Sequence, residues 1–141
     1  WFTNGRTSHT FLVYYDIDFE RDMVMEATEG GYKITPFSKY EKEVIAIFEP
    51  KVPIEYGLKK SIDLLEQDYD YVGLVGMIWV CLGSWLKRKW RNPLHSSNAM
   101  FCSEAIVKVL QWSNYPEAEK FESFSTSPED LLIFFEKENK N

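Results

Sequence analysis

The stretch NAMFCSEAIV, residues 98–107, decides the fold and the chemistry that we expect of this chain. A polar, loop-like approach leads into Cys102, and apolar positions such as Ile106 and Leu110 then recur at helical spacing, which predicts a helix over residues 99–112. Cys102 therefore stands where this helix begins. Helix N-termini carry partial positive charge and unpaired N–H groups, and such surroundings favour a thiolate, the reactive form of cysteine.

Length, charge and cysteine content limit the number of domains, the class of partner and the compartment that we expect. The 141 residues suffice for one domain with a real core, so we expect a single domain over residues 1–141. The chain starts at Trp1 rather than Met, which indicates a fragment or a processed product and would hide a signal peptide. The net charge of −6 argues against nucleic-acid binding. Two cysteines favour a reducing, cytoplasmic compartment; in an exported protein Cys81 and Cys102 could pair and silence the thiol.

The first half of the chain predicts an antiparallel meander of strands. Residues 9–16 (HTFLVYYD) are rich in β-branched and aromatic side chains, and residues 21–28 (RDMVMEAT) are the expected hairpin partner. A turn at residues 29–31 precedes a third strand over residues 32–37. Residues 43–49 (EVIAIFE) are the expected fourth strand.

The second half predicts helices. Pro53 suits a first helical position, and apolar residues at helical spacing continue to Leu65. Residues 71–86 form an apolar run that is short for a membrane span and is interrupted by glycines, so we expect a buried helix and no integral membrane span. The sequence SPED at residues 127–130 supplies an N-cap, a proline and two acids for a last helix. Strands followed by helices suggest an α+β fold.

Three side chains can form a catalytic group. A hairpin that turns within residues 16–19 places Glu26 opposite His9 or one diagonal step away, on the same face of the sheet. A carboxylate beside an imidazole fixes the tautomer of the ring and favours its charged form. If the later helix delivers Cys102 to that face, the three residues can act as nucleophile, base and orienting group.

Each of these residues also has a structural interpretation. A lone cysteine on a helix is most often a small buried hydrophobe. A strand histidine such as His9 is more often packed or hydrogen-bonded than catalytic, and Glu26 can be a solvated strand residue. His95 is either a substrate contact or rival base, or an exposed loop residue. The basic cluster at residues 87–91 either contacts an anionic lipid or partner, or complements a helix end.

The sequence gives no sign of a metal or cofactor. No His/Cys/Asp cluster has the spacing of metal ligands, and no glycine-rich motif that cradles phosphate occurs. We therefore expect neither a metal nor a cofactor.

Several short motifs follow one another along the chain: SH at residues 8–9, MEA at 25–27, DYVGLVG at 70–76, FCSE at 101–104 and SPEDL at 127–131. Together they resemble the permuted NlpC/P60 proteins of papain-like fold, the YiiX-like group. The similarity extends from Ser8 to Leu131. Such proteins normally have a strand with a Gly-Asp motif before the histidine, but only seven residues precede Ser8 here. That strand is therefore missing or lies upstream of this fragment.

The resemblance implies a circularly permuted papain-like fold, with an antiparallel sheet packed against helices. It implies a thiol nucleophile at Cys102, a general base at His9 and an orienting residue at Glu26, although the third member varies across the superfamily. The expected activity is a cysteine hydrolase, an amidase or peptidase acting on cell-wall-type peptide amides through an acyl-enzyme. A lipid acyltransferase or thioesterase of the same superfamily stays open, as does a non-catalytic structural or binding domain. The expected partner is a peptide or acyl-bearing small substrate.

Overall fold

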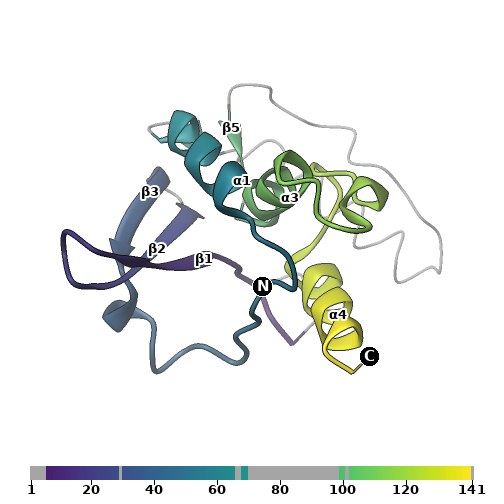
Figure 1. The fold of residues 1–141 in the computed structure, drawn as a ribbon, viewed down its shortest axis with the longest axis horizontal. Helices are drawn as coiled ribbons and strands as arrows, with labels where there is room; N and C mark the ends of the chain where they lie inside the picture. Colours follow the sequence, from purple (N-terminus) through teal and green to yellow (C-terminus); the bar gives the residue numbers. More distant parts are fainter. Residues whose placement is uncertain (1–5, 29, 66–67, 70–98, 101, 141) are drawn as a thin grey trace.

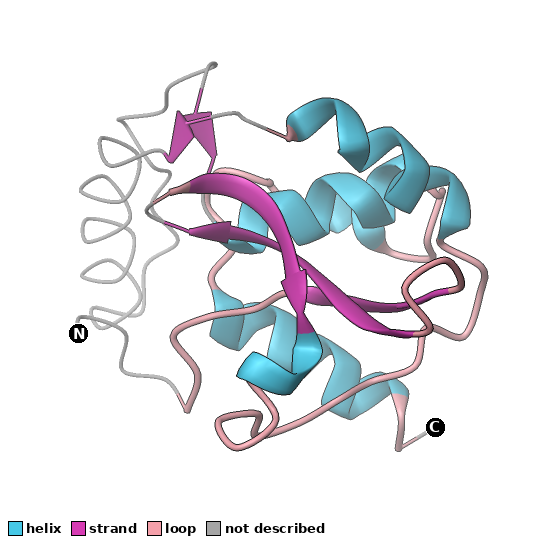
Figure 2. Ribbon diagram, turned by 90° about the vertical axis from the view of Figure 1, so that its left-hand side faces the viewer, coloured by secondary structure: helices cyan, strands magenta, loops and turns pink. Residues whose placement is uncertain are grey.

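A computed structural model describes most of the chain. The described residues are 6–28, 30–65, 68–69, 99–100 and 102–140. The predicted helix over residues 71–86, together with Cys81, His95 and the basic cluster, lies outside them. The described part has an α+β architecture, in which a three-stranded antiparallel sheet lies against helices (Figures 1 and 2). The prediction of an α+β fold is therefore confirmed.

The sheet has the order β1–β2–β3 and is antiparallel throughout. Its strands are β1 (Leu12–Asp16), β2 (Arg21–Thr28) and β3 (Gly31–Pro36). A second, parallel pair consists of β4 (Asp68–Tyr69) and β5 (Ala99–Met100). The helical elements are η1 (Phe37–Lys39), α1 (Glu55–Lys60), η2 (Ser61–Leu64), α3 (Cys102–Trp112), η3 (Ala118–Lys120) and α4 (Pro128–Glu138).

The predicted strand pairing is correct for the hairpin but not at its ends. The strand over residues 21–28 is confirmed, and the third strand starts and ends one residue earlier than predicted. The first strand begins at Leu12, which pairs with Met25, so the prediction that His9 belongs to this strand is wrong. His9 lies in the segment that leads into β1, and none of the described strands pairs with its backbone.

The fourth strand predicted over residues 43–49 is wrong. This segment has no regular secondary structure, and its side chains at Ile45 and Ile47 are exposed. The apolar pattern of residues 43–49 therefore does not indicate a half-buried strand. Instead Phe48 stacks on Phe135 of α4, with ring centroids 5.7 Å apart, so the segment packs against a helix rather than joining the sheet.

Two predicted helices begin later than expected because tertiary contacts set their first residues. Pro53 is not the first helical residue, since α1 starts at Glu55. The Ser113 hydroxyl donates to the Ile54 carbonyl and accepts from the Gly57 N–H. Ser113 directly follows α3, so a residue at the end of α3 fixes where α1 begins. The helix predicted over residues 99–112 starts at Cys102, because Ala99–Met100 pairs with β4 instead.

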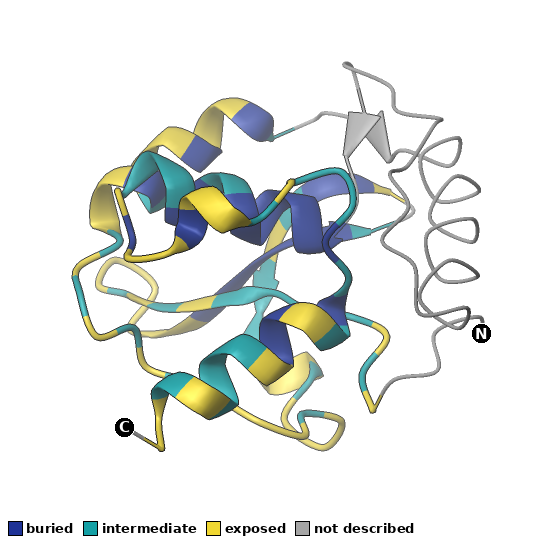
Figure 3. Ribbon diagram, turned by 90° about the vertical axis from the view of Figure 1, so that its right-hand side faces the viewer, coloured by how far each residue is buried: buried dark blue, intermediate teal, exposed yellow. Residues whose placement is uncertain are grey.

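Helix α3 lies at the centre of the described fold. Ala105 packs with Met25 and Ala27 of the sheet, in a cluster that also contains Tyr32 and Leu64. On another side of the helix, Leu110 belongs to a second cluster with Leu131 of α4 and with Tyr115. Figure 3 shows the burial along this helix, of which every residue from Cys102 to Val107 is buried. The position of the Cys102 backbone is thus fixed by the core.

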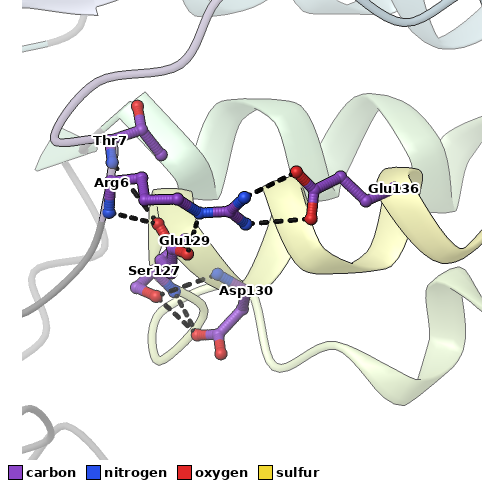
Figure 4. Close-up of polar contacts among 6 residues, drawn as sticks. All are labelled: Arg6, Thr7, Ser127, Glu129, Asp130 and Glu136. Carbon is purple, nitrogen blue, oxygen red and sulfur yellow. Dashed lines mark hydrogen bonds and ion pairs between the residues drawn. The ribbon is translucent and has the colours of Figure 1, made fainter. Parts of the chain in front are cut away.

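The last helix begins as its sequence predicts. Ser127 is the N-cap of α4 and forms a reciprocal capping box with Asp130, and Pro128 follows it (Figure 4). The capping box satisfies N–H groups that would otherwise lack an intrahelical partner. This local motif needs no tertiary partner, which explains why it was predictable.

We expect Gly57→Ala to destabilise the protein because α1 and α3 meet at this glycine. An alanine Cβ would lie 2.1 Å from the Val109 carbonyl oxygen, which belongs to helix backbone and cannot move aside. Overpacking of this severity costs about 3 kcal/mol, and replacing a helical glycine by alanine returns about 1 kcal/mol of helix propensity. The expected net loss in the free energy of unfolding is therefore about 2 kcal/mol. Urea denaturation measures this loss. The matched control is Gly30→Ala, whose Cβ would meet nothing closer than 3.9 Å; equal effects at both positions would contradict the prediction.

Candidate active site

His9 and Glu26 are joined by a direct contact. The Nε2 atom of His9 lies 3.0 Å from the Oε2 atom of Glu26. The Glu26 side chain is fully buried, whereas about a third of the His9 side chain (35 %) is exposed. The ring therefore bridges a buried carboxylate and the protein surface.

Two hydroxyl groups hold the other oxygen of Glu26. The Tyr40 hydroxyl donates to Oε1 at 2.5 Å, and the Thr35 hydroxyl donates to the same atom at 3.1 Å. Burial by itself would raise the pKa of Glu26, but the hydrogen bonds from His9, Tyr40 and Thr35 outweigh it and lower the pKa below its usual value. The carboxylate is thus ionised at neutral pH, and each of its oxygens has a partner.

Aromatic rings lie around this carboxylate. The Phe11 ring contacts the rings of His9 and Tyr40, with centroids 5.9 and 5.3 Å away, and meets Phe37 edge-on at 6.5 Å. Apolar surroundings strengthen the electrostatic interactions of the hydrogen bonds that they shield from water. The arrangement favours a fixed Glu26–His9 pair over a solvated one.

The His9 ring also contacts Cys102. Burial lowers the pKa of His9, but hydrogen bonds with Cys102 and Glu26 and the charges on both partners raise it from the usual 6.5 to about 9. Nε2 faces Glu26, so Nδ1 is the ring nitrogen that has no hydrogen bond to this carboxylate. The imidazole therefore has both a carboxylate and a thiol as neighbours.

Cys102 is the first residue of α3 and carries a free thiol. Only 6 % of the residue is exposed. The helix packs against Met25 and Ala27, which alternation places on the opposite face of β2 from Glu26. Because His9 precedes the paired part of β1, its ring is free to contact both groups.

A clamp at the surface holds the segment that carries His9 (Figure 4). The Arg6 guanidinium donates to both oxygens of Glu136, at 2.7 and 2.9 Å, and its Nε donates to Glu129. The Arg6 backbone N–H also donates to Glu129, and the Thr7 hydroxyl donates to the His9 carbonyl. Single surface ion pairs contribute little, but this network is bidentate and ties the chain before β1 to α4.

The structure brings together the three residues that the sequence singled out, His9, Glu26 and Cys102; their catalytic role stays a prediction. Sequence analysis did not find Tyr40, Thr35 or Arg6. Thr35 could have been found from the register, because it pairs with Val24, two residues from Glu26 on the same face. Tyr40 and Arg6 carry no sequence signal, since loops bring them to their partners.

Within the described residues, no group of three or more His, Cys, Asp or Glu side chains could hold a metal ion. The same residues include no helix with the length and hydropathy needed to cross a membrane. Comparison with family models, curated proteins and solved structures finds no match to this chain.

We expect the His9 imidazole to titrate with a midpoint near 9 in an NMR titration, because a carboxylate and a sulfur stabilise its charged form. The chain has two histidines, so His9→Gln assigns the resonance. The folded state binds this proton more tightly than the unfolded state, whose pKa is near 6.5. Relative to His9→Gln, the wild type should therefore lose stability as the pH rises from 6.5 to 9. A midpoint near 6.5 would contradict the prediction.

Tyr40→Phe should destabilise the protein, because it removes a hydrogen bond to a buried carboxylate without changing the shape of the ring. Hydrogen bonds to charged groups contribute about 1.5–3 kcal/mol. The loss of this donor also raises the pKa of Glu26, so stability should be lost at a higher pH on acidification. Denaturant titrations at neutral and acidic pH measure both effects. Tyr56→Phe, at an exposed tyrosine, is the control and should change neither; a similar response of both variants would refute the assignment.

Proposed function

We propose that this protein is a thiol hydrolase in which Cys102 is the nucleophile, His9 the general base and Glu26 the orienting group. One observation carries the proposal: the His9 ring bridges a buried, hydrogen-bonded carboxylate and the thiol at the first residue of a core helix. The three residues come from segments that are far apart in sequence, and a purely structural role for each does not require them to meet. The permuted papain-like topology is part of the same proposal.

The reaction follows from the roles of the three groups. Because the pKa of His9 is raised to about 9, the ring already holds the proton of the Cys102 thiol at neutral pH, and the sulfur of this ion pair attacks the substrate carbonyl carbon. Negative charge develops on the carbonyl oxygen, and backbone N–H groups in the first turn of α3, which lack intrahelical partners, can stabilise it. The tetrahedral intermediate collapses, and His9 donates its proton to the leaving amine. Water then attacks the thioester, which releases the acid and restores the thiol.

Glu26 supports this cycle through His9. Its carboxylate holds a proton on Nε2 and leaves Nδ1 as the nitrogen available to the thiol. Its negative charge also stabilises the imidazolium that forms when the thiol loses its proton. The pKa of His9, raised to about 9, allows the ring to keep that proton at neutral pH until the leaving group takes it.

The substrate class that we propose is a peptide amide of the cell-wall type. The motif resemblance supports this class, and the acyl-transfer geometry accommodates it. The same chemistry would cleave an acyl ester or thioester, so the substrate is distinguished by experiment: peptidoglycan fragments and acyl lipids are offered in parallel and the products compared.

Substitution of the three residues should separate a catalytic site from a structural one. We expect Cys102→Ala to abolish hydrolysis and His9→Gln to lower it by about 100-fold or more, the usual contribution of general acid–base catalysis. Glu26→Gln should give a smaller loss with a shifted pH profile. The assay is release of amine from peptidoglycan fragments, with circular dichroism to confirm folding.

A thiol-reactivity measurement complements the assay because it needs no substrate. Iodoacetamide followed by peptide mapping compares the alkylation rates of Cys102 and Cys81 in the folded protein. We expect Cys102 to react faster, and His9→Gln to remove the difference. If the two thiols react equally in both proteins and no substrate is cleaved, the domain is a non-catalytic module.

A further inference from the structure

The hairpin between β1 and β2 exposes large apolar side chains at its tip, residues 17–20. Ile17 is 81 % exposed and Phe19 is 68 % exposed, and Tyr15 and Val13 follow along one face of β1. Figure 1 shows the tip at the left edge of the molecule, at the end away from α3 and α4. Single exposed apolar residues are ordinary, but four along one hairpin form a patch.

The tip is held in a fixed shape. The Asp16 carboxylate accepts the N–H groups of Asp18 and Phe19, each at 3.0 Å. Glu20 adopts a φ of 49°, in the left-handed region that favours glycine over residues with a side chain. A glycine there would give a more stable turn. Retained backbone strain next to exposed apolar side chains points to a role other than stability.

Strand β1 also offers a backbone edge. Among the strands that the structure describes, its partner is β2, and it forms the outer strand of the sheet. The outward N–H and C=O groups of an edge strand are a template for a further strand from another chain. Val13 and Tyr15 are exposed on one face of this edge strand, where they would lie beside the side chains of an added strand.

The charges of the hairpin indicate which kind of segment can bind to it. Acidic residues alternate with the apolar ones along the hairpin: Asp16, Asp18, Glu20 and Asp22. Arg21 is the single basic residue between Asp16 and Asp22, and it lines a shallow hollow of about 400 Å³ with Phe19, Met23 and Pro36. The hairpin therefore presents an apolar surface within a negative field, and this combination is complementary to a segment that alternates apolar and basic residues.

We infer that the β1 edge and the hairpin tip bind an extended polypeptide segment of a partner protein, one in which apolar and basic side chains alternate. The segment adds to β1 as a strand, its apolar side chains contact Tyr15, Ile17 and Phe19, and its basic side chains pair with the acids of the tip. A second copy of this chain fits less well, because it carries a net charge of −6 itself. An anionic bilayer would be repelled by the same acids.

The test uses a fluorescent peptide of alternating lysine and valine, titrated with the full chain in physiological salt and followed by anisotropy. We expect saturable binding that falls by about tenfold or more in the double variant Ile17→Ser/Asp18→Asn. A matched control removes an equally adjacent apolar and acidic pair elsewhere, Ile62→Ser/Asp63→Asn, both exposed, and should bind within about twofold of the wild type. Both pairs lie at the surface, so the variants should fold, which circular dichroism verifies.

A second peptide distinguishes strand addition from charge attraction. It has the same sequence with alternate amides N-methylated, which removes the N–H groups that pair with a strand edge. We expect its affinity to fall by about tenfold or more. The inference is overturned if the first peptide does not bind, if both double variants lose affinity equally, or if N-methylation changes nothing. It is also overturned if Ile17→Ser/Asp18→Asn instead abolishes self-association of the protein or its binding to phosphatidylcholine vesicles. None of these measurements depends on hydrolytic activity, so this inference and the proposed function can fail independently.

Discussion

A buried carboxylate is stable as an anion only when hydrogen bonds replace the water that it has lost, and the Glu26 side chain meets this requirement with three partners. One of its oxygens faces His9, and the other accepts from Tyr40 and Thr35. These contacts join the segment before β1, the middle of the sheet and the turn after η1. Much of the geometry of the candidate site follows from the need to satisfy this one charge.

The second constraint is the position of α3. The helix is packed on one side by the sheet and on another by α4, so the residue at its first position has little freedom to move. Cys102 occupies that position, where helix geometry leaves N–H groups without intrahelical partners. The Arg6 clamp on Glu129 and Glu136 then holds the His9 segment to α4. A thiol, an imidazole and a carboxylate that are distant in sequence are in this way held by one core.

Elements whose residue pattern depends on neighbouring residues alone were predicted correctly from the sequence. The β2 strand was predicted to the residue, and the start of α4 was predicted from the Ser127 N-cap with the proline and acids that follow it. Predictions were wrong where contacts with residues distant in sequence decide the conformation of a segment. Residues 43–49 alternate like a strand, but Phe48 packs on Phe135 and no sheet edge receives them. His9 was placed in a strand that begins only at Leu12, and this error matters, because its position outside the pairing lets the ring contact both Glu26 and Cys102.

The sequence alone determined the α+β class, the hairpin partner of β1, the capped last helix and the identity of three residues whose chemistry could be combined. These features depend on the periodicity of side chains and on short-range hydrogen bonds, both of which are determined by neighbouring residues. Only the tertiary structure decided that Tyr40 and Thr35 complete the hydrogen bonding of Glu26 and that Arg6 fixes the segment of His9. Those contacts join residues between 9 and 130 positions apart, and satisfying a buried charge depends on which groups meet in space rather than on which are adjacent in the chain.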